Sequence, residues 1–149
     1  MKYRDFYTTL TLSLKKFNCV SIGPSVSISG KRINISNYDI DTSLRYIIFP
    51  IKIYGHNIKH LNILILDQKT KIIERYEPFN QYLNFDQIND LLESLLYKLM
   101  EDGKIYFLKY QTTLNSENLS DKNCGMYCIK YITKMLFEMQ NNENMLEKN

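Results

Sequence analysis

Cys124 is the residue with the clearest chemical potential in this sequence, because it precedes Gly125 at the start of a helical pattern. A thiol at a helix N-terminus meets backbone N–H groups and the positive end of the helix dipole, and both favour the thiolate. Gly125 leaves room for a substrate carbonyl, and the local N–H groups could hold an oxyanion. The alternative is that Cys124 is a small buried apolar residue like Cys128, four positions further on.

A nucleophilic thiol normally works with an imidazole, and the chain has two histidines, His56 and His60. His56 lies in a polar stretch, where a solvated position is expected. His60 begins a β-rich run that ends at Asp67, and a strand end could aim its ring rigidly into a cleft. His60 is therefore the candidate base, with an ordinary polar residue as the alternative.

An acid is needed to orient the imidazole and hold its tautomer. The next β-rich run ends at Glu77, directly before Pro78. In a hairpin, the start of the first strand faces the end of the second, so Glu77 is expected beside His60. Asp67, which ends the first run, is the fallback acid. Arg75, which lies between Asp67 and Glu77 in sequence, is expected to form a cross-strand ion pair, with substrate binding as the alternative.

These residues resemble those of the adenovirus protease (adenain) and the SUMO-specific cysteine proteases. The resemblance rests on chain order and spacing: Glu77 follows His60 by 17 residues, and Cys124-Gly125 opens a helix about 50 residues later. Two segments, HLN at 60–62 and IERYEP at 73–78, resemble more closely the small, mostly uncharacterised members of this clan from large DNA viruses. The AT-rich codon bias that the composition suggests agrees with such a source.

The resemblance implies His60 as general base, Glu77 as its orienting acid and Cys124 as nucleophile. It further implies a thiol protease that hydrolyses peptide or isopeptide bonds, acting on ubiquitin-like conjugates or on viral structural precursors. No cofactor and no metal are implied. The partner would be a protein or peptide substrate.

The resemblance also implies an oxyanion hole, completed by a polar amide six or seven residues before the cysteine. Asn118 stands six residues before Cys124, and Glu117 stands seven before. Gln111 is a second amide that a longer loop could bring into place. Together with the backbone at Gly125, Asn118 and Gln111 are the candidate oxyanion donors.

One departure from the family pattern supports a different function. The bulky aromatic residue that commonly follows the histidine is Leu61 here. The second hypothesis is therefore a catalytically inactive member of the same fold, acting as a viral structural or protein-binding module. A third is an unrelated α+β protein in which Cys124 is only a core residue.

The elements that must hold these residues are predicted from hydrophobic periodicity. Strands are predicted over Tyr46 to Ile53, His60 to Asp67, Thr70 to Tyr76 and Lys104 to Tyr110, with helices over Phe85 to Met100 and Cys124 to Met139. Pro50 predicts an edge or a bulge in its strand. A hairpin is predicted around Ser29 and Gly30, and the segment up to Phe17 fits either a strand or a helix.

This order of elements predicts an α+β fold of the papain-like, adenain/SUMO-protease type. It would have a central mixed β-sheet flanked by helices and the nucleophile at a helix N-terminus. With 149 residues, 44% of them hydrophobic, one domain is expected over residues 1–140, with a flexible tail over 141–149.

Charge and composition argue against several other classes of protein. The net charge of +3 comes without a run of like charges, so nucleic-acid binding has no electrostatic footprint. No apolar run approaches the roughly 20 residues of a membrane span, and no secretory signal is visible. The three cysteines predict neither a disulfide framework nor a zinc site. An intracellular protein is expected, in the host cytoplasm or the virion.

Overall fold

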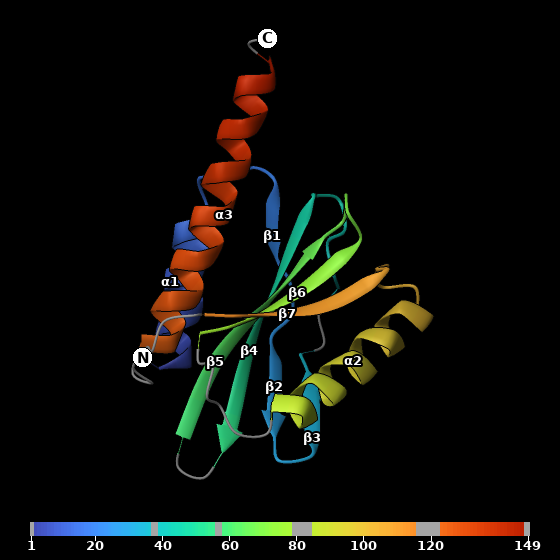
Figure 1. The fold of residues 1–149 in the computed structure, drawn as a ribbon. Coiled ribbons are helices and arrows are strands. Elements are labelled where there is room, and N and C mark those ends of the chain that lie inside the picture. The colour runs from blue at the N-terminus through green and yellow to red at the C-terminus, as the bar shows by residue number, and fades with distance from the viewer. Residues whose placement is uncertain (1, 37–38, 56–57, 79–84, 116–122, 148–149) are drawn as a thin grey trace.

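A seven-stranded mixed sheet forms the centre of the fold in a computed structural model, which describes residues 2–36, 39–55, 58–78, 85–115 and 123–147 (Figure 1). Six strands follow the order β3-β2-β4-β5-β6-β7, and β1 pairs with the first part of β4. The strands are β1 (Val20–Ile22), β2 (Val26–Ser29), β3 (Arg32–Ile35), β4 (Tyr46–Gly55), β5 (Ile58–Asp67), β6 (Ile72–Glu77) and β7 (Lys109–Leu114).

Hairpins form the middle of the sheet, and parallel pairs extend it. The pairs β2/β3, β4/β5 and β5/β6 are antiparallel, whereas β1 and β2 run parallel to β4, and β7 runs parallel to β6. The predicted hairpin at Ser29 and Gly30 is confirmed as the β2/β3 turn, where Gly30 has a φ of 60°. The β5/β6 hairpin predicted for the centre of the domain is also confirmed.

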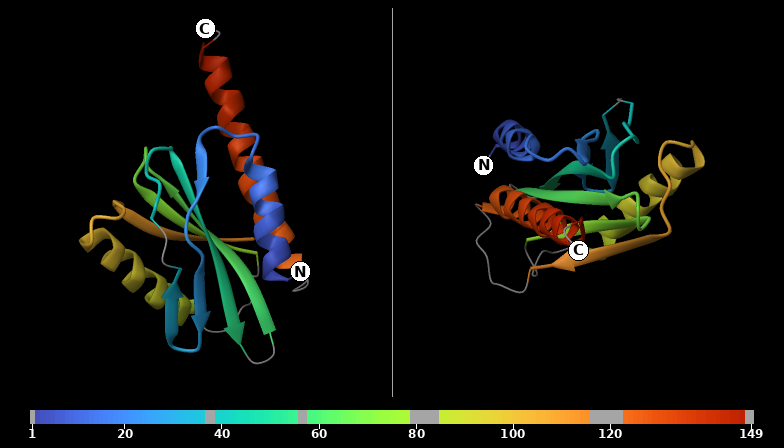
Figure 2. Two further views of the ribbon diagram at one scale, coloured as in Figure 1. Left: turned by 180° about the vertical axis from the view of Figure 1, so that it is seen from behind. Right: turned by 90° about the horizontal axis from the view of Figure 1, so that it is seen from above.

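Three helices cover the two faces of this sheet: α1 (Tyr3–Leu14), α2 (Phe85–Glu101) and α3 (Cys124–Glu147). α1 and α3 lie side by side on one face, and α2 crosses the other (Figure 2). The predicted α+β class is therefore confirmed, with a mixed sheet flanked by helices and Cys124 at a helix N-terminus.

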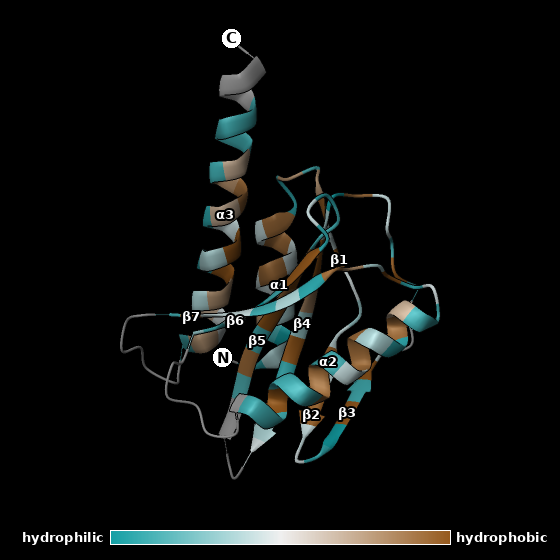
Figure 3. Ribbon diagram, turned by 45° about the vertical axis from the view of Figure 1, so that its right-hand side comes forward, coloured by the Kyte–Doolittle hydropathy of each residue, from teal (hydrophilic) through white to brown (hydrophobic). Residues whose placement is uncertain are grey.

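Strand β5 shows how one segment supplies both cores. Leu61, Ile63 and Ile65 pack towards α1 and α3, whereas Leu64 and Leu66 pack towards α2. Successive side chains of a strand point to opposite faces, so a strand covered on both sides is apolar almost throughout. The apolar bands on both strands and helices are visible in Figure 3.

The N-terminal segment, whose pattern fits either a strand or a helix, forms the helix α1. Phe6, Leu10 and Leu14 are buried on one face, while Leu12 is 61% exposed. This burial follows the four-residue spacing of a helix and not the two-residue alternation of a strand.

The prediction that Pro50 marks an edge or a bulge is wrong, because β4 is an interior strand and Pro50 pairs with Ile63 of β5. The backbone of Ile48, two residues earlier, faces β1, since its carbonyl accepts from the Gly23 N–H (2.8 Å). Pro50 must face the same way, towards the gap between β1 and β2. The missing proline N–H therefore falls where no strand needs it.

The strand predicted over Lys104 to Tyr110 is also wrong in position, because β7 begins at Lys109 and ends at Leu114. Ile105 and Phe107 alternate like strand residues and are buried in the α2-side core, but they pair with no strand. Their alternation reflects packing against α2, and pairing with β6 starts only after the chain passes Leu108. The residues from Gln111 to Leu114, which follow the predicted strand, belong to the observed one.

Helix α3 runs further than the sequence pattern indicated. It continues to Glu147, so residues 141–147 of the predicted flexible tail are helical. This end of α3 extends past the sheet (Figure 1), and residues 140–143 within it are polar, while its flexibility stays a prediction. Among the described residues, no helix is long and apolar enough to cross a membrane.

Candidate active site

The candidate site forms where β6 ends and the N-terminus of α3 begins. β6 stops at Glu77 because the next residue is Pro78, which has no N–H for a sheet ladder. Where β6 has ended, the backbone of β5 at Leu61 contacts the start of α3 instead of a strand. The Leu61 N–H donates to Sγ of Cys124 (3.3 Å), and the Leu61 carbonyl accepts from Sγ of Cys128 (3.7 Å).

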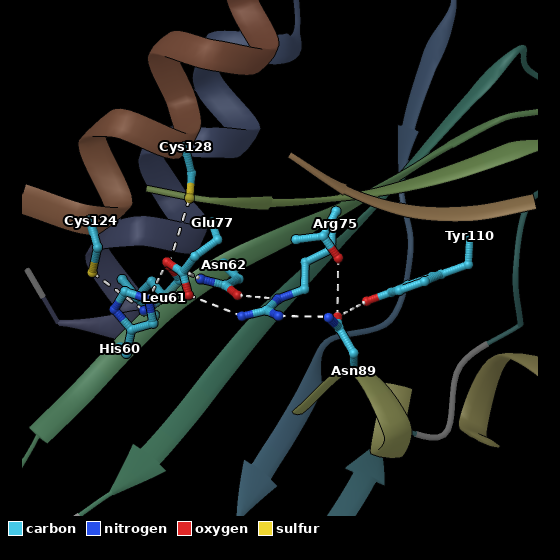
Figure 4. Close-up of polar contacts among 10 residues, drawn as sticks. His60, Leu61, Asn62, Arg75, Glu77, Asn89, Tyr110, Cys124 and Cys128 are labelled. Atoms are coloured by element: carbon cyan, nitrogen blue, oxygen red, sulfur yellow. Dashed lines mark hydrogen bonds and ion pairs between the residues drawn. The ribbon is translucent and has the colours of Figure 1, made fainter. Parts of the chain in front are cut away.

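This junction brings His60, Glu77 and Cys124 together (Figure 4). Nε2 of His60 lies 2.6 Å from Oε2 of Glu77, and the His60 ring also hydrogen-bonds with Cys124. With Nε2 on the carboxylate, Nδ1 is the ring nitrogen left for the thiol. His60 and Glu77 are almost completely buried. The arrangement has the order acid, imidazole, thiol that nucleophilic catalysis requires.

His60 is predisposed to hold a proton. Burial by itself lowers the pKa of His60, but the hydrogen bonds with Cys124 and Glu77 outweigh it and raise the pKa to about 9. As an imidazolium, the ring donates from both nitrogens, to the Glu77 carboxylate and to the sulfur. The Leu61 N–H is a second donor to the same sulfur. Two hydrogen-bond donors therefore point at the sulfur of Cys124.

At least three side chains among the described residues hold Glu77. Besides His60, its carboxylate accepts from Nη2 of Arg75 (3.0 Å) and from Nδ2 of Asn62 (3.3 Å). The prediction of a cross-strand ion pair for Arg75 is wrong, because Arg75 and Glu77 share strand β6 and alternate residues of a strand share a face. The cross-strand contact of Arg75 is to an amide, Oδ1 of Asn62 (2.7 Å).

The polar network continues away from the site to α2 and β7. Nη1 of Arg75 donates to Oδ1 of Asn89 (3.1 Å), which also accepts from the hydroxyl of Tyr110 (2.6 Å). Sequence reasoning gave no role to Asn62, Asn89 or Tyr110. Asn62 alone carried a signal, since a polar residue inside an apolar strand needs a partner.

The other two cysteines differ from Cys124. All three are free thiols. Cys128 is buried and Cys19 is half-buried, and burial raises the pKa of both thiols. Neither faces an imidazole in the contacts described, so they are natural internal references for the reactivity of Cys124.

Gly125 is the second residue of α3. The first N–H groups of an α-helix have no acceptor within the helix, so those near Gly125 can face an oxyanion. Gln111 lies in β7 and pairs in register with Glu74. Asn118 lies outside the described residues, as do Glu117 and His56. The choice of oxyanion amide stays a prediction.

Asp67, the fallback acid, is engaged at the other end of β5. It accepts hydrogen bonds from Nε and Nη2 of Arg45, both at 3.1 Å. This pair lies seven residues along the strand from His60, roughly 23 Å at the usual rise. Among the described residues, no group of three His, Cys, Asp or Glu side chains could hold a metal ion.

The chain is similar in sequence to an uncharacterized protein, 082L, of Invertebrate iridescent virus 3. The two are 28% identical over 145 residues, and the match covers 90% of this chain and 88% of the viral protein. No protein-family model matches the chain.

The chain is also similar to several solved structures, and it spans less than half the length of each. SUMO protease Ulp1 has a TM-score of 0.47 and 18% identity, over 64% of this chain and 43% of that one. ChlaDub1 from Chlamydia trachomatis has a TM-score of 0.48 and 11% identity, over 64% and 49%. The Legionella pneumophila effector RavZ has a TM-score of 0.45 and 13% identity, over 80% and 39%.

Proposed function

We propose that this protein is a cysteine peptidase that hydrolyses peptide or isopeptide bonds with Cys124 as nucleophile, His60 as general base and acid, and Glu77 as the orienting carboxylate. The observation that supports this activity is the 2.6 Å contact between His60 and Glu77, on a ring that also hydrogen-bonds with Cys124. The substrates we propose are ubiquitin-like conjugates or viral precursor proteins. The place of action would be the host cytoplasm or the virion.

The reaction would begin when the Cys124 thiolate attacks the carbonyl carbon of the substrate. The backbone N–H groups near Cys124 and Gly125 would hold the oxyanion, with an amide from Asn118 or Gln111 as the further donor. The His60 imidazolium then protonates the leaving amine as its C–N bond breaks, which leaves a thioester. His60 next takes a proton from water, and hydroxide attack releases the acid product and regenerates the thiolate.

A substrate panel tests this activity directly. The purified chain is incubated with glycine-rich peptides and with SUMO and ubiquitin conjugates, and cleavage products are separated by mass. We expect Cys124→Ser and His60→Ala to lower kcat/KM by at least about 10³-fold. Cys19→Ser is the matched control and should retain activity. Cleavage that survives Cys124→Ser would contradict the proposal.

A second candidate function is favoured by the burial of the thiol, since Cys124 is only 4% exposed. A site closed in this way also suits an inactive member of the fold that binds proteins without cutting them. Alkylation by iodoacetamide at pH 7, followed site by site by mass spectrometry, separates the two functions. A peptidase requires Cys124 to react much faster than Cys19, whereas equal rates would favour the binding module.

A further inference from the structure

We propose that Arg75 is a positioning residue for this triad, which fixes the Glu77 carboxylate and keeps the buried cluster electrically neutral. This inference rests on the proposed cysteine peptidase chemistry. Arg75 is 0% exposed and is among the largest fully buried side chains. An unpaired buried charge is very costly, so a guanidinium in this position must have compensating partners.

The first part of the proposal is geometric. Arg75 bridges Glu77 on its own strand (3.0 Å), Asn62 on β5 (2.7 Å) and Asn89 on α2 (3.1 Å). Three anchors on three elements leave the guanidinium plane little freedom. The Glu77 oxygen that faces Arg75 is Oε1, and the one that faces His60 is Oε2. Fixing one oxygen therefore fixes the other, and with it the imidazole ring.

The second part is a charge balance. With a neutral thiol and imidazole, Arg75 and Glu77 cancel. With a thiolate and an imidazolium, four charges again sum to zero. Without Arg75, the cluster would carry one net negative charge in either state. An added negative charge makes protons harder to remove, so both Cys124 and His60 would keep their protons to higher pH.

The charged and titratable groups that face Arg75 lie on two of the four elements packed around it. They are Glu77 on β6 and Tyr110 on β7, while the contacts from β5 and α2 are the neutral amides of Asn62 and Asn89. Burial raises the pKa of Tyr110 to about 12, so this phenol stays neutral at working pH. The negative charge of Glu93 also raises the pKa of Tyr110. Among the described residues, Cys128 is a further titratable group near the thiol and the imidazole, and burial raises its pKa, so it stays neutral.

The test measures two midpoints on the full chain. One is the pH at which iodoacetamide alkylation of Cys124 reaches half its plateau rate, and the other is the NMR titration midpoint of His60. Arg75→Gln should move both midpoints to higher pH, by about one unit or more. Arg75→Lys keeps the charge and should leave both near their wild-type values, even if the plateau rate falls. Arg45→Gln is the matched control, because Arg45 pairs with Asp67 at the far end of β5.

If Arg75→Gln does not fold, as judged by circular dichroism, Asn89→Asp carries the test. This variant keeps the oxygen that accepts from Nη1 of Arg75 and adds one negative charge to the cluster, so both midpoints should again move to higher pH. Midpoints that stay in place in Arg75→Gln while its melting temperature drops, or an equal shift in Arg75→Lys, would overturn the charge-balance role. Wild-type Cys124 that reacts no faster than Cys19 would instead overturn the peptidase proposal, and this inference with it.

Discussion

Leu61 contributes to the candidate site through its backbone. Its N–H donates to Sγ of Cys124 and its carbonyl accepts from Sγ of Cys128. Both contacts depend on the path of β5 and not on the side chain at this position. The absence of an aromatic residue at Leu61, a departure from the family pattern, therefore leaves the hydrogen bond to the thiol in place.

The protonation of His60 is the first prediction at the scale of single residues. Because its hydrogen bonds with Cys124 and Glu77 raise the pKa to about 9, the His60 signal in a two-dimensional NMR titration should have its midpoint near pH 9. Glu77→Gln removes a negative charge and should lower that midpoint. The chain has two histidines, so His56→Gln assigns the signals. A midpoint at or below 6.5 would contradict the described geometry.

The elements show which parts of the fold a sequence pattern can predict. The helix at 85–101 and the β5/β6 hairpin follow from local periodicity and local turns, so both were predictable. Pro50 and β7 were not, because each depends on a neighbour distant in sequence. Pro50 is tolerated in an interior strand only because β1 ends and β2 begins beside it. β7 is defined by its pairing with β6 and not by its own alternation.

The turn between β5 and β6 offers a test at the scale of elements. Lys71 has a φ of 64°, in the left-handed region that favours glycine. Lys71→Gly should raise the free energy of unfolding by up to about 1 kcal/mol and the melting temperature by about 3 °C. Lys69→Gly is the matched control: Lys69 is exposed in the same turn, and the variant should lose about 0.4–1 kcal/mol because glycine makes the unfolded chain more flexible. Equal losses in thermal melts of the two variants would argue against strain at Lys71.

At the scale of the whole molecule, the candidate triad was predictable and its support was not. His60, Glu77 and Cys124 are reactive residue types at strand and helix ends. Hairpin geometry predicted that His60 lies beside Glu77, and the family resemblance added Cys124. Asn62 and Asn89 are amides without chemistry of their own, and only the assembled fold reveals that both converge on Arg75.

The projecting end of α3 carries a prediction about the whole molecule. Residues 137–138 and 140–143 are exposed, and Glu143 makes a surface ion pair with Arg45 (3.3 Å). Exposed pairs contribute little, so a chain that ends at Gln140 should melt within about 3 °C of the full chain. Alkylation of Cys124 should be unchanged. A chain that ends before Leu136, which is fully buried, should be much less stable. If the first truncation unfolds the protein, this end of α3 supports the fold.

Strand β5 pairs with β6 along one part of its edge and contacts the start of α3 along the next, and this arrangement has a consequence for folding kinetics. The hairpin pairs residues close in sequence, whereas Leu61 and Cys124 are 63 residues apart. Contacts of low sequence separation generally form first, so a refolding chain should acquire the hairpin before the contact between Leu61 and Cys124. Pulsed alkylation during refolding would then follow the last docking step of the molecule. The refolding time at which Cys124 reaches its native alkylation rate would therefore report when α3 docks on β5.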